Sequence, residues 1–217
     1  KGRYINEIWG YTTKGIAKSN EEMNAHLSTT DQSTIGSNWA AGDIMYEDTN
    51  NDKQINDGAR TITDHGDLKV IGNSTPRFLW GIDLNASWKG FDIRAFFQGV
   101  MKRDAWLGGS WGSLEYYFGA TNSGEWWATG ITAVKDYYRD ANTWSVANGY
   151  QKANQDAFLP RATFSNKNER CQTRYLMNAA YMRLKNFQAG YTIPRNITTK
   201  WGISNMRVFV SIENLFT

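Results

Sequence analysis

Alternation of apolar and polar residues is the clearest pattern in this sequence, and its longest stretch lies between positions 77 and 100. Successive side chains of a β-strand point to opposite faces, so a period of two predicts strands with one apolar and one polar face. The single break, at Lys89-Gly90, predicts an antiparallel hairpin with strands over 77–88 and 91–101. The apolar face is expected to carry Phe78, Trp80, Ile82, Trp88, Phe91 and Phe97, and the polar face Asp83, Asn85, Asp92 and Arg94.

A later segment shows the same alternation with a change of phase. From Phe187 to Ile193 the odd positions are apolar, whereas Met182 and Leu184 upstream have the opposite parity. One extra residue in the strand would bring both groups to one face, which predicts a β-bulge near Lys185-Asn186. Pro194 cannot donate to a strand ladder and is expected to end this strand.

The remaining segments are less regular. Residues 4–16 are predicted to contain one strand, and Ser19 followed three residues later by Glu22 is the capping box typical of a helix start. Residues 43–73 are rich in Asp, Asn and Gly and are predicted to form a structured loop. Residues 102–175 lack sustained alternation, and a loop of that length in a compact domain is usually functional.

The length of the alternating segments favours a membrane-spanning barrel. Soluble strands have about 5 or 6 residues, whereas a transmembrane strand needs about 9 to 11, with aromatic residues near both interfaces. The short turn at Lys89-Gly90 and the connection over 195–205 alternate with two long loops, so residues 43–73 and 102–175 are expected outside the cell. Four or five strands cannot close a barrel, because about eight are needed. The expected fold class is therefore all-β, an incomplete portion of an antiparallel transmembrane β-barrel with long extracellular loops.

Composition agrees with an all-β protein and excludes several functions. The chain has 217 residues, with 10 Trp, 11 Tyr and 10 Phe but only 3 Pro, which suits strands. A net charge of +3 without a Lys/Arg cluster argues against nucleic-acid binding. The sequence has no run of about 18 apolar residues, so it predicts no transmembrane helix. No signal peptide begins the chain, and the lone Cys171 excludes an intramolecular disulfide. Residues 206–217 alternate as a strand that stops without a turn, so we expect a piece of a longer protein.

Several phrases, in their order along the chain, resemble one family. They are GDIMYEDTNNDKQIND (42–57), IGNSTPRFLWGIDLNASWKGFDIRAFFQGV (71–100), YMRLKNFQAGYTIP (181–194) and MRVFVSIENLFT (206–217), and the earlier EIWGYTTKGIAKSNEEM (7–23) fits as well. Together they resemble the C-terminal barrel region of SusC/RagA-family TonB-linked outer-membrane proteins. The resemblance covers most of the chain apart from the Trp-rich loop.

The resemblance implies a barrel of about 22 strands with an N-terminal plug, in the outer membrane of a member of the Bacteroidota. It also implies active import powered through TonB, and a SusD-like surface lipoprotein that caps the barrel. Residues 1–217 would be the C-terminal part of that barrel, in contact with lipid, while the plug and the TonB box would lie outside this chain. An oligosaccharide is the expected substrate, with an oligopeptide as the alternative, and no enzymatic activity is expected.

One polar segment has the spacing of a calcium loop. DTNNDKQIND, residues 48–57, matches the first nine positions of an EF-hand-type loop, in which alternate residues supply oxygen ligands. Lys53 stands where Gly is usual, and Ala59 stands where a bidentate acid is needed. The favoured alternative is a loop of Asx turns that binds no ion. Calcium is thus a candidate and no cofactor is expected, and the candidate ligands are Asp48, Asn50, Asp52, Gln54 and Asn56.

Aromatic residues gather in the long loop over residues 102–175, which includes a short predicted helix around 131–140. Trp and Tyr rings offer large contact areas at low entropic cost and stack on sugar rings. For a single Trp, packing of the loop against itself or against the partner lipoprotein is the favoured interpretation. For the loop as a whole, contact with substrate or partner is an equal alternative. The candidate contact residues are Trp106, Trp111, Trp126 and Trp127.

Two other classes of protein are alternatives to a membrane transporter. A soluble extracellular β-domain that binds glycan, with or without calcium, would need a second sheet over the apolar face of residues 78–97, whereas a transporter would leave that face to lipid. A glycoside hydrolase needs two placed carboxylates, and no spacing singles out such a pair. His26 and His65 are far apart, are expected in surface loops, and predict no catalytic pair.

Overall fold

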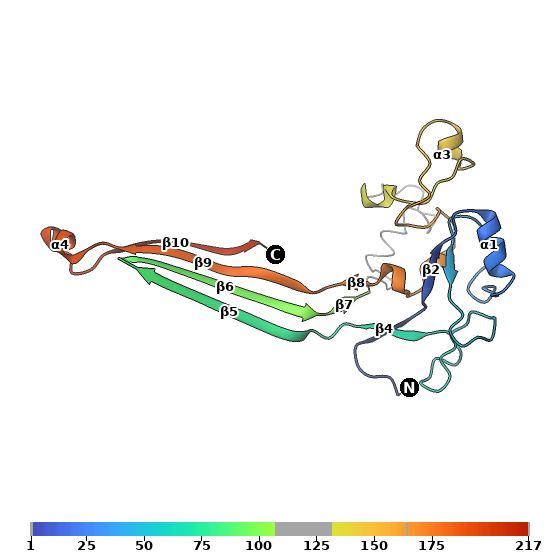
Figure 1. Ribbon diagram of the computed structural model, residues 1–217, viewed down its shortest axis with the longest axis horizontal. Coiled ribbons are helices and arrows are strands. Elements are labelled where there is room, and N and C mark those ends of the chain that lie inside the picture. Colours follow the sequence, from blue (N-terminus) through green and yellow to red (C-terminus); the bar gives the residue numbers. More distant parts are fainter. Residues whose placement is uncertain (1, 107–131, 164, 217) are drawn as a thin grey trace. The chain divides into compact units, whose positions relative to one another are not determined.

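The computed structural model describes residues 2–106, 132–163 and 165–216, and its strands are mostly antiparallel (Figure 1). The chain divides into two compact units. The loop unit comprises Lys1–Ser74 and Ala105–Met177, and the sheet unit comprises Thr75–Asp104 and Asn178–Thr217. Within the described ranges, no helix is long and apolar enough to cross a membrane.

The sheet unit is a four-stranded antiparallel sheet with the order β10-β9-β6-β5. Its strands are β5 (Arg77–Trp88), β6 (Phe91–Lys102), β9 (Tyr181–Thr192) and β10 (Arg207–Phe216). Three of them have 12 residues and β10 has 10, so each reaches the length that a tilted transmembrane strand requires. The predicted hairpin is confirmed as β5 and β6.

The hairpin turns at the predicted dipeptide. Lys89 has φ +47° and Gly90 has φ +91°, and Trp88 pairs directly with Phe91. A two-residue turn with both residues at positive φ matches the right-handed twist of its strands, which makes it the favoured hairpin connection. Lys89 also places its Nζ 4.8 Å from the centre of the Trp88 ring.

The predicted bulge in β9 is confirmed. Phe96 pairs with Asn186, but the next residue, Phe97, pairs with Leu184, so Lys185 is the extra residue. The shift brings Leu184 to the apolar side of the sheet beside Phe97. Pro194 follows the end of β9 at Thr192, and the chain continues as α4 (Arg195–Thr198) and the 3-10 turn η4 (Thr199–Trp201).

The loop unit contains short strands and helical turns around a small core. β1 (Glu7–Gly10) pairs with β4 (Lys69–Asn73), and β2 (Thr13–Ile16) pairs with β3 (Ile44–Tyr46), both antiparallel. The helical elements are α1 (Asn20–Leu27), η1 (Thr132–Lys135), α3 (Trp144–Ala147), η2 (Asn166–Asn168) and η3 (Thr173–Tyr175). Two-residue strands, β7 (Asp104–Ala105) and β8 (Met177–Asn178), pair where the chain passes between the units.

Three predictions for the loop unit need correction. The single strand expected over 4–16 is two strands, because the Tyr11 backbone leaves the ladder, donating to the Cys171 carbonyl at 2.8 Å and accepting from Thr173 at 3.0 Å. The loop expected over 43–73 begins with β3 and ends with β4. The helix expected around 131–140 is a single 3-10 turn, after which the chain pairs with residues near Leu159.

The start of α1 follows the predicted capping box with one change. Ser19 is the N-cap, and its hydroxyl accepts a hydrogen bond from the Glu22 amide at 3.2 Å. The Glu22 carboxylate accepts from the amide of Lys18 at 2.6 Å, one residue before the N-cap. Both contacts satisfy amide groups that the helix itself leaves unpaired.

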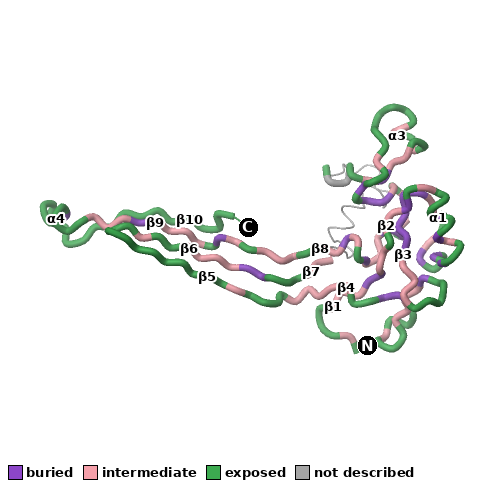
Figure 2. The backbone as a smooth tube through the Cα atoms, in the orientation of Figure 1, coloured by how far each residue is buried: buried purple, intermediate pink, exposed green. Residues whose placement is uncertain are grey.

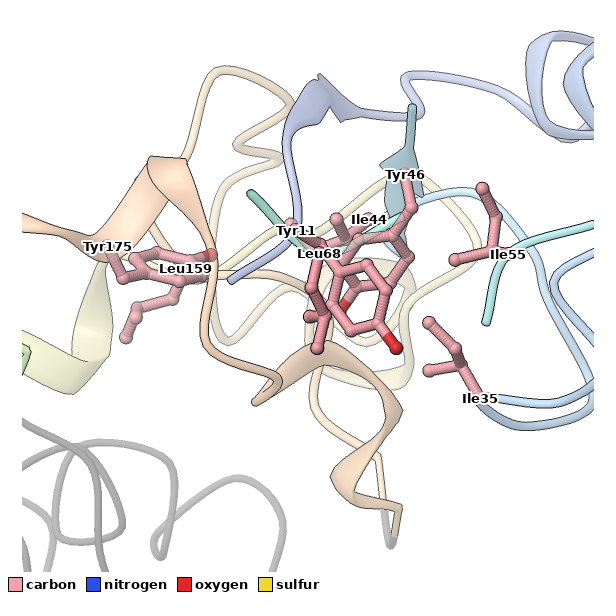
Figure 3. Close-up of a cluster of buried hydrophobic side chains, with 8 residues drawn as sticks. All are labelled: Tyr11, Ile35, Ile44, Tyr46, Ile55, Leu68, Leu159 and Tyr175. Atoms are coloured by element: carbon pink, nitrogen blue, oxygen red, sulfur yellow. The ribbon is translucent and has the colours of Figure 1, made fainter. Parts of the chain in front are cut away.

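Burial differs between the two units. Figure 2 shows exposed residues along most of β5 and all of β10, whereas β3 lies within a buried stretch over residues 41–46. The main core cluster of the loop unit is drawn in Figure 3, where Tyr11 and Tyr46 lie against each other with ring centres 5.3 Å apart. Its buried members are Tyr11, Ile35, Ile44, Tyr46, Ile55, Leu68, Leu159 and Tyr175.

Candidate functional site

One face of the four-stranded sheet is apolar and uncovered. The register places Ile82 opposite Phe97 and Ala86 opposite Ile93, so these side chains share a face. Seven of the large apolar residues on this face are between 48% and 70% exposed, although burial of one such side chain is worth about 1.5–3 kcal/mol in water. They are Ile82, Leu84, Trp88, Phe91, Ile93, Val208 and Val210.

The opposite face of the sheet is polar and is crossed by ion pairs. Arg94 donates to Asp83 through Nε at 3.1 Å and through Nη2 at 2.6 Å. A second pair joins Arg207 of β10 to Asp92 of β6, with β9 lying between these strands. It is possible because β9 has Gly190 at this point: a Cβ there would lie 2.6 Å from the Arg207 Nη2. The absence of a side chain thus leaves room for the ion pair.

The predicted division of residues between the two faces is confirmed for the regular part of the hairpin. Asn85 lies opposite Arg94 and Ser87 opposite Asp92, all with the polar parity. Phe78 departs from the pattern, because its φ of +54° lies outside the β region and the alternation rule no longer fixes its face. The regular segment therefore separates an apolar from a charged surface.

A buried carboxylate organises the loop unit. Asp43 is fully buried and accepts hydrogen bonds from Arg161 Nε at 2.9 Å, Lys167 Nζ at 2.8 Å and Asn168 Nδ2 at 3.0 Å. Burial alone would raise the pKa of Asp43, but these donors outweigh it and hold the pKa below its ordinary 3.8. The donors lie more than a hundred residues from Asp43, so no spacing in the sequence indicates the cluster.

The candidate calcium residues form a loop of local hydrogen bonds. Asp48 accepts from the amides of Asn51 at 2.6 Å and Lys53 at 2.8 Å, and Asp52 accepts from the Gln54 amide at 2.8 Å. Lys53 has φ +66°, the left-handed conformation for which Gly is favoured at this position. Asn50 and Asn56 also use their side-chain oxygens within the loop.

A buried carboxylate holds this loop in place. Asp67 is fully buried and accepts from the amides of Thr49 at 2.7 Å and Asn56 at 2.9 Å. In the part of the chain that the structure describes, no three His, Cys, Asp or Glu residues are grouped to hold a metal ion. Calcium at this loop therefore stays a candidate, and the loop of Asx turns that binds no ion stays the favoured alternative.

The aromatic candidates fall in different places. Trp106 is partly buried and packs against the main core cluster, which agrees with the packing alternative for this residue. Trp111, Trp126 and Trp127 lie outside the described residues. The sequence did not single out Trp144, which is 71% exposed and stacks on Tyr150 with ring centres 5.4 Å apart, and this stack is a second exposed aromatic surface.

The prediction of surface histidines is wrong for His26. This residue lies in α1, is 8% exposed, and its Nε2 is 3.0 Å from the Gln32 Oε1. Burial lowers the pKa of His26, so the ring is neutral at neutral pH. His65 is half-buried and packs on Trp9 with ring centres 5.6 Å apart.

Comparison with known proteins identifies a homologous protein and solved structures with a similar fold. No family model matches the sequence. The chain is 26% identical over 220 residues to TonB-dependent receptor P3 of Formosa agariphila, covering 100% of this chain and 18% of that protein. The chain thus spans less than a fifth of the length of this relative.

Solved structures of RagAB have a fold similar to that of this chain. The structure of the RagAB peptide transporter matches 98% of this chain and 19% of its own, with a TM-score of 0.61 and 19% identity. The "open-open" state of the RagAB peptide importer matches 96% of this chain and 18% of its own, with a TM-score of 0.56 and 18% identity. The chain is homologous to part of a TonB-dependent receptor, and its fold is an incomplete portion of an antiparallel β-barrel.

Proposed function

We propose that residues 1–217 are the C-terminal part of the barrel of a SusC/RagA-type TonB-dependent importer, in the outer membrane of a bacterium of the Bacteroidota. The observation that carries this proposal is the sheet with one uncovered apolar face and one charged face. Homology to a TonB-dependent receptor supports the assignment to TonB-dependent import at the outer membrane.

A lipid surrounding accounts for the exposed side chains of the sheet. In water, a face with Leu84, Trp88 and Phe91 more than half exposed would drive association, whereas in a bilayer it meets hydrocarbon. The polar face, with its ion pairs from Asp83 and Asp92, would line the water-filled interior. The outer strands β5 and β10 would pair with further strands of a complete barrel, which leaves no open edge.

The partners of the complete protein follow from the same proposal. TonB would supply energy through an N-terminal region, and a SusD-like lipoprotein would cap the extracellular end. The substrate would be an oligosaccharide, which the many Trp and Tyr residues of segment 102–175 favour because such rings stack on sugars. An oligopeptide is the alternative, since the RagAB structures are those of a peptide importer.

The alternative of a soluble glycan-binding module agrees less well with the sheet. Such a module would bury the apolar face under a second sheet, and Ile82, Leu84 and Val210 of this face remain exposed. The Trp144–Tyr150 stack suits sugar contact in either class of protein, so it does not favour the soluble module.

Uptake by the source organism tests the function. We expect deletion of the gene to abolish uptake of one labelled class, oligosaccharide or oligopeptide, and complementation with the full-length gene to restore it. Complementation with Trp111, Trp126 and Trp127 all changed to Ala should lower uptake while the protein still reaches the outer membrane. Trp201→Ala, an exposed Trp after α4, is the matched control. Unchanged uptake of both classes after gene deletion would contradict the function.

A further inference from the structure

A cavity of about 470 Å³ lies within the loop unit, and this volume falls in the range of small-molecule sites, about 300–1,000 Å³. Its apolar lining comes from Trp9, Ile35 and Leu68. Its polar lining comes from Arg3, Tyr11, Asp57, Arg60, Arg170 and Cys171.

Positive charges predominate among the side chains that line the cavity. Asp57 forms an ion pair with Arg60, which leaves Arg3 and Arg170 without a carboxylate partner among the described lining residues. Burial raises the pKa of the Tyr11 hydroxyl and of the Cys171 thiol to about 12, so both are neutral at neutral pH. Arg3 and Arg170 therefore line a cavity in which the carboxylate of Asp57 is already paired with Arg60.

Arg3 presents the edge of its guanidinium group that binds carboxylates elsewhere in this protein. Arg161 uses Nε and Nη2 to donate to the two oxygens of Asp43, both at 2.9 Å, and Arg94 uses the same two nitrogens for Asp83. In Arg3 the Nε and Nη2 are buried, and no described group accepts from either. The guanidinium plane is set by Trp9, whose ring centre lies 4.2 Å from the Arg3 Cζ.

Arg170 adds a further donor in the same cavity. Its Nε is also buried without an acceptor in the described ranges, and its Nη2 reaches only the Ile35 carbonyl, at the long distance of 3.4 Å. A buried donor without an acceptor is costly, more so when it is charged. A ligand oxygen that reached these nitrogens would remove that cost.

We propose that this cavity binds the carboxylate group of a small ligand, with Arg3 donating to both oxygens and Arg170 donating to one of them. A planar carboxylate fits the flat, two-pronged edge of a guanidinium group. Trp9, Ile35 and Leu68 would contact the part of the ligand next to the carboxylate. Two natural sources share this chemistry: the C-terminal carboxylate of a peptide and the carboxylate of a uronic acid. The binding itself does not depend on the proposed import function.

Calorimetry on the full-length protein in detergent tests the proposal. The probes are N-acetyl-alanyl-leucine, its C-terminal amide, glucuronate, glucose and inorganic phosphate. We expect at least one carboxylate to bind, and its uncharged counterpart to bind about tenfold more weakly or not at all. Binding by the peptide acid alone, by glucuronate alone or by both supports the proposal and identifies the source of the carboxylate.

Variants separate charge from geometry. Arg3→Gln and Arg170→Gln should each weaken binding about tenfold. Arg3→Lys should weaken it nearly as much, because Lys keeps the charge but loses the two-pronged edge. Lys152→Gln removes one exposed positive charge from the same unit, away from the cavity, and is the control.

The contrary outcomes are equally distinct. No binding of either carboxylate, equal binding of the acid and its amide, or binding of phosphate as tight as that of the carboxylates would overturn the proposal. Unchanged binding in Arg3→Gln, with wild-type thermal stability, would do the same. The uptake measurement does not enter any of these outcomes, so failure here is distinguishable from failure of the import function.

Discussion

The sheet unit and the loop unit place apolar and charged groups in opposite ways. In the sheet unit, Leu84 and Val210 are more than half exposed, and the ion pairs lie on an open face. In the loop unit, apolar side chains such as Ile44 and Ile55 are fully buried, and so is the carboxylate of Asp43. The proposed function accounts for this difference by two solvents: hydrocarbon on one face of the sheet, and water around the loop unit.

The two units also differ in the range of their stabilising contacts. The hairpin of β5 and β6 joins residues that are neighbours in sequence across a two-residue turn. The contacts of Asp43 with Arg161 and Lys167 join segments separated by more than a hundred residues. A change in the hairpin should therefore act on membrane assembly, whereas a change at Asp43 should act on the folding of the loop unit.

The largest expected effect is that of Asp43→Asn on the loop unit. Loss of the carboxylate leaves the buried Lys167 without a counter-charge, and breaking a buried ion pair costs about 3–5 kcal/mol. Hydrogen exchange of the full-length protein should show faster exchange over residues 36–46 and 161–172, with β5 and β6 unchanged.

The control is Asp156→Asn, which removes one partner of the exposed pair with Lys18 and should leave stability nearly unchanged. The pH supplies a second check. Because the pKa of Asp43 is lowered in the folded protein, its contribution to stability is present above pH 3.8. That contribution is lost as the pH falls through the lower folded-state pKa. The difference between wild type and Asp43→Asn should thus persist at neutral pH and shrink below 3.8. Equal hydrogen exchange in wild type and Asp43→Asn at neutral pH would contradict a structural role for Asp43.

The next effect is that of a charge on the apolar face. Ile93→Arg should cost about 2–4 kcal/mol if the residue lies near the middle of the bilayer, and should lower the amount of folded, heat-modifiable protein in outer-membrane fractions. Ser87→Arg adds the same charge to the polar face, opposite Asp92, and should assemble normally. Arg94→Ala loses only an exposed ion pair and should leave assembly nearly unchanged. Equal loss of assembly in Ile93→Arg and Ser87→Arg would contradict the two-faced sheet.

A smaller effect is expected at the hairpin turn. Gly90→Ala places a Cβ at φ +91°, 2.9 Å from the Thr192 carbonyl oxygen, so we expect a cost of about 1–2 kcal/mol. Gly202→Ala is the matched control, because its φ is +71° and a Cβ there meets nothing within 4 Å. Urea unfolding of the full-length protein in detergent should show the larger loss for Gly90→Ala, and equal losses would show that contact with β9 is unimportant.

Local patterns were enough to predict the sheet unit. The turn at Lys89-Gly90 and the bulge at Lys185 follow from a period of two and its change of phase, both of which are written in neighbouring residues. Even so, no local pattern indicates that Gly190 lets Arg207 reach Asp92, because that contact crosses a strand from another part of the sequence.

The loop unit was less predictable because distant contacts decide its structure. The expected strand over 4–16 is divided at Tyr11 by backbone bonds to the segment around Cys171. Arg3 and Arg170 are likewise separated by most of the chain, and neither stands in a recognisable motif. Sequence spacing did indicate an ordered Asx-rich loop at 48–57, but it carries no information about the carboxylate of Asp67 that holds this loop.

Nitroxide scanning of the hairpin tests the central claim that one face of the sheet meets lipid. Single cysteines would replace Ala86 and Ala95 on the apolar face, and Asn85 and Gln98 on the polar face, in a full-length Cys171→Ala background reconstituted in lipid. Oxygen concentrates in the bilayer, whereas a nickel chelate stays in water. We expect preferential relaxation by oxygen at 86 and 95, and by the nickel chelate at 85 and 98. Access of the nickel chelate to 86 and 95 equal to that at 85 and 98 would contradict a lipid-facing side of the sheet.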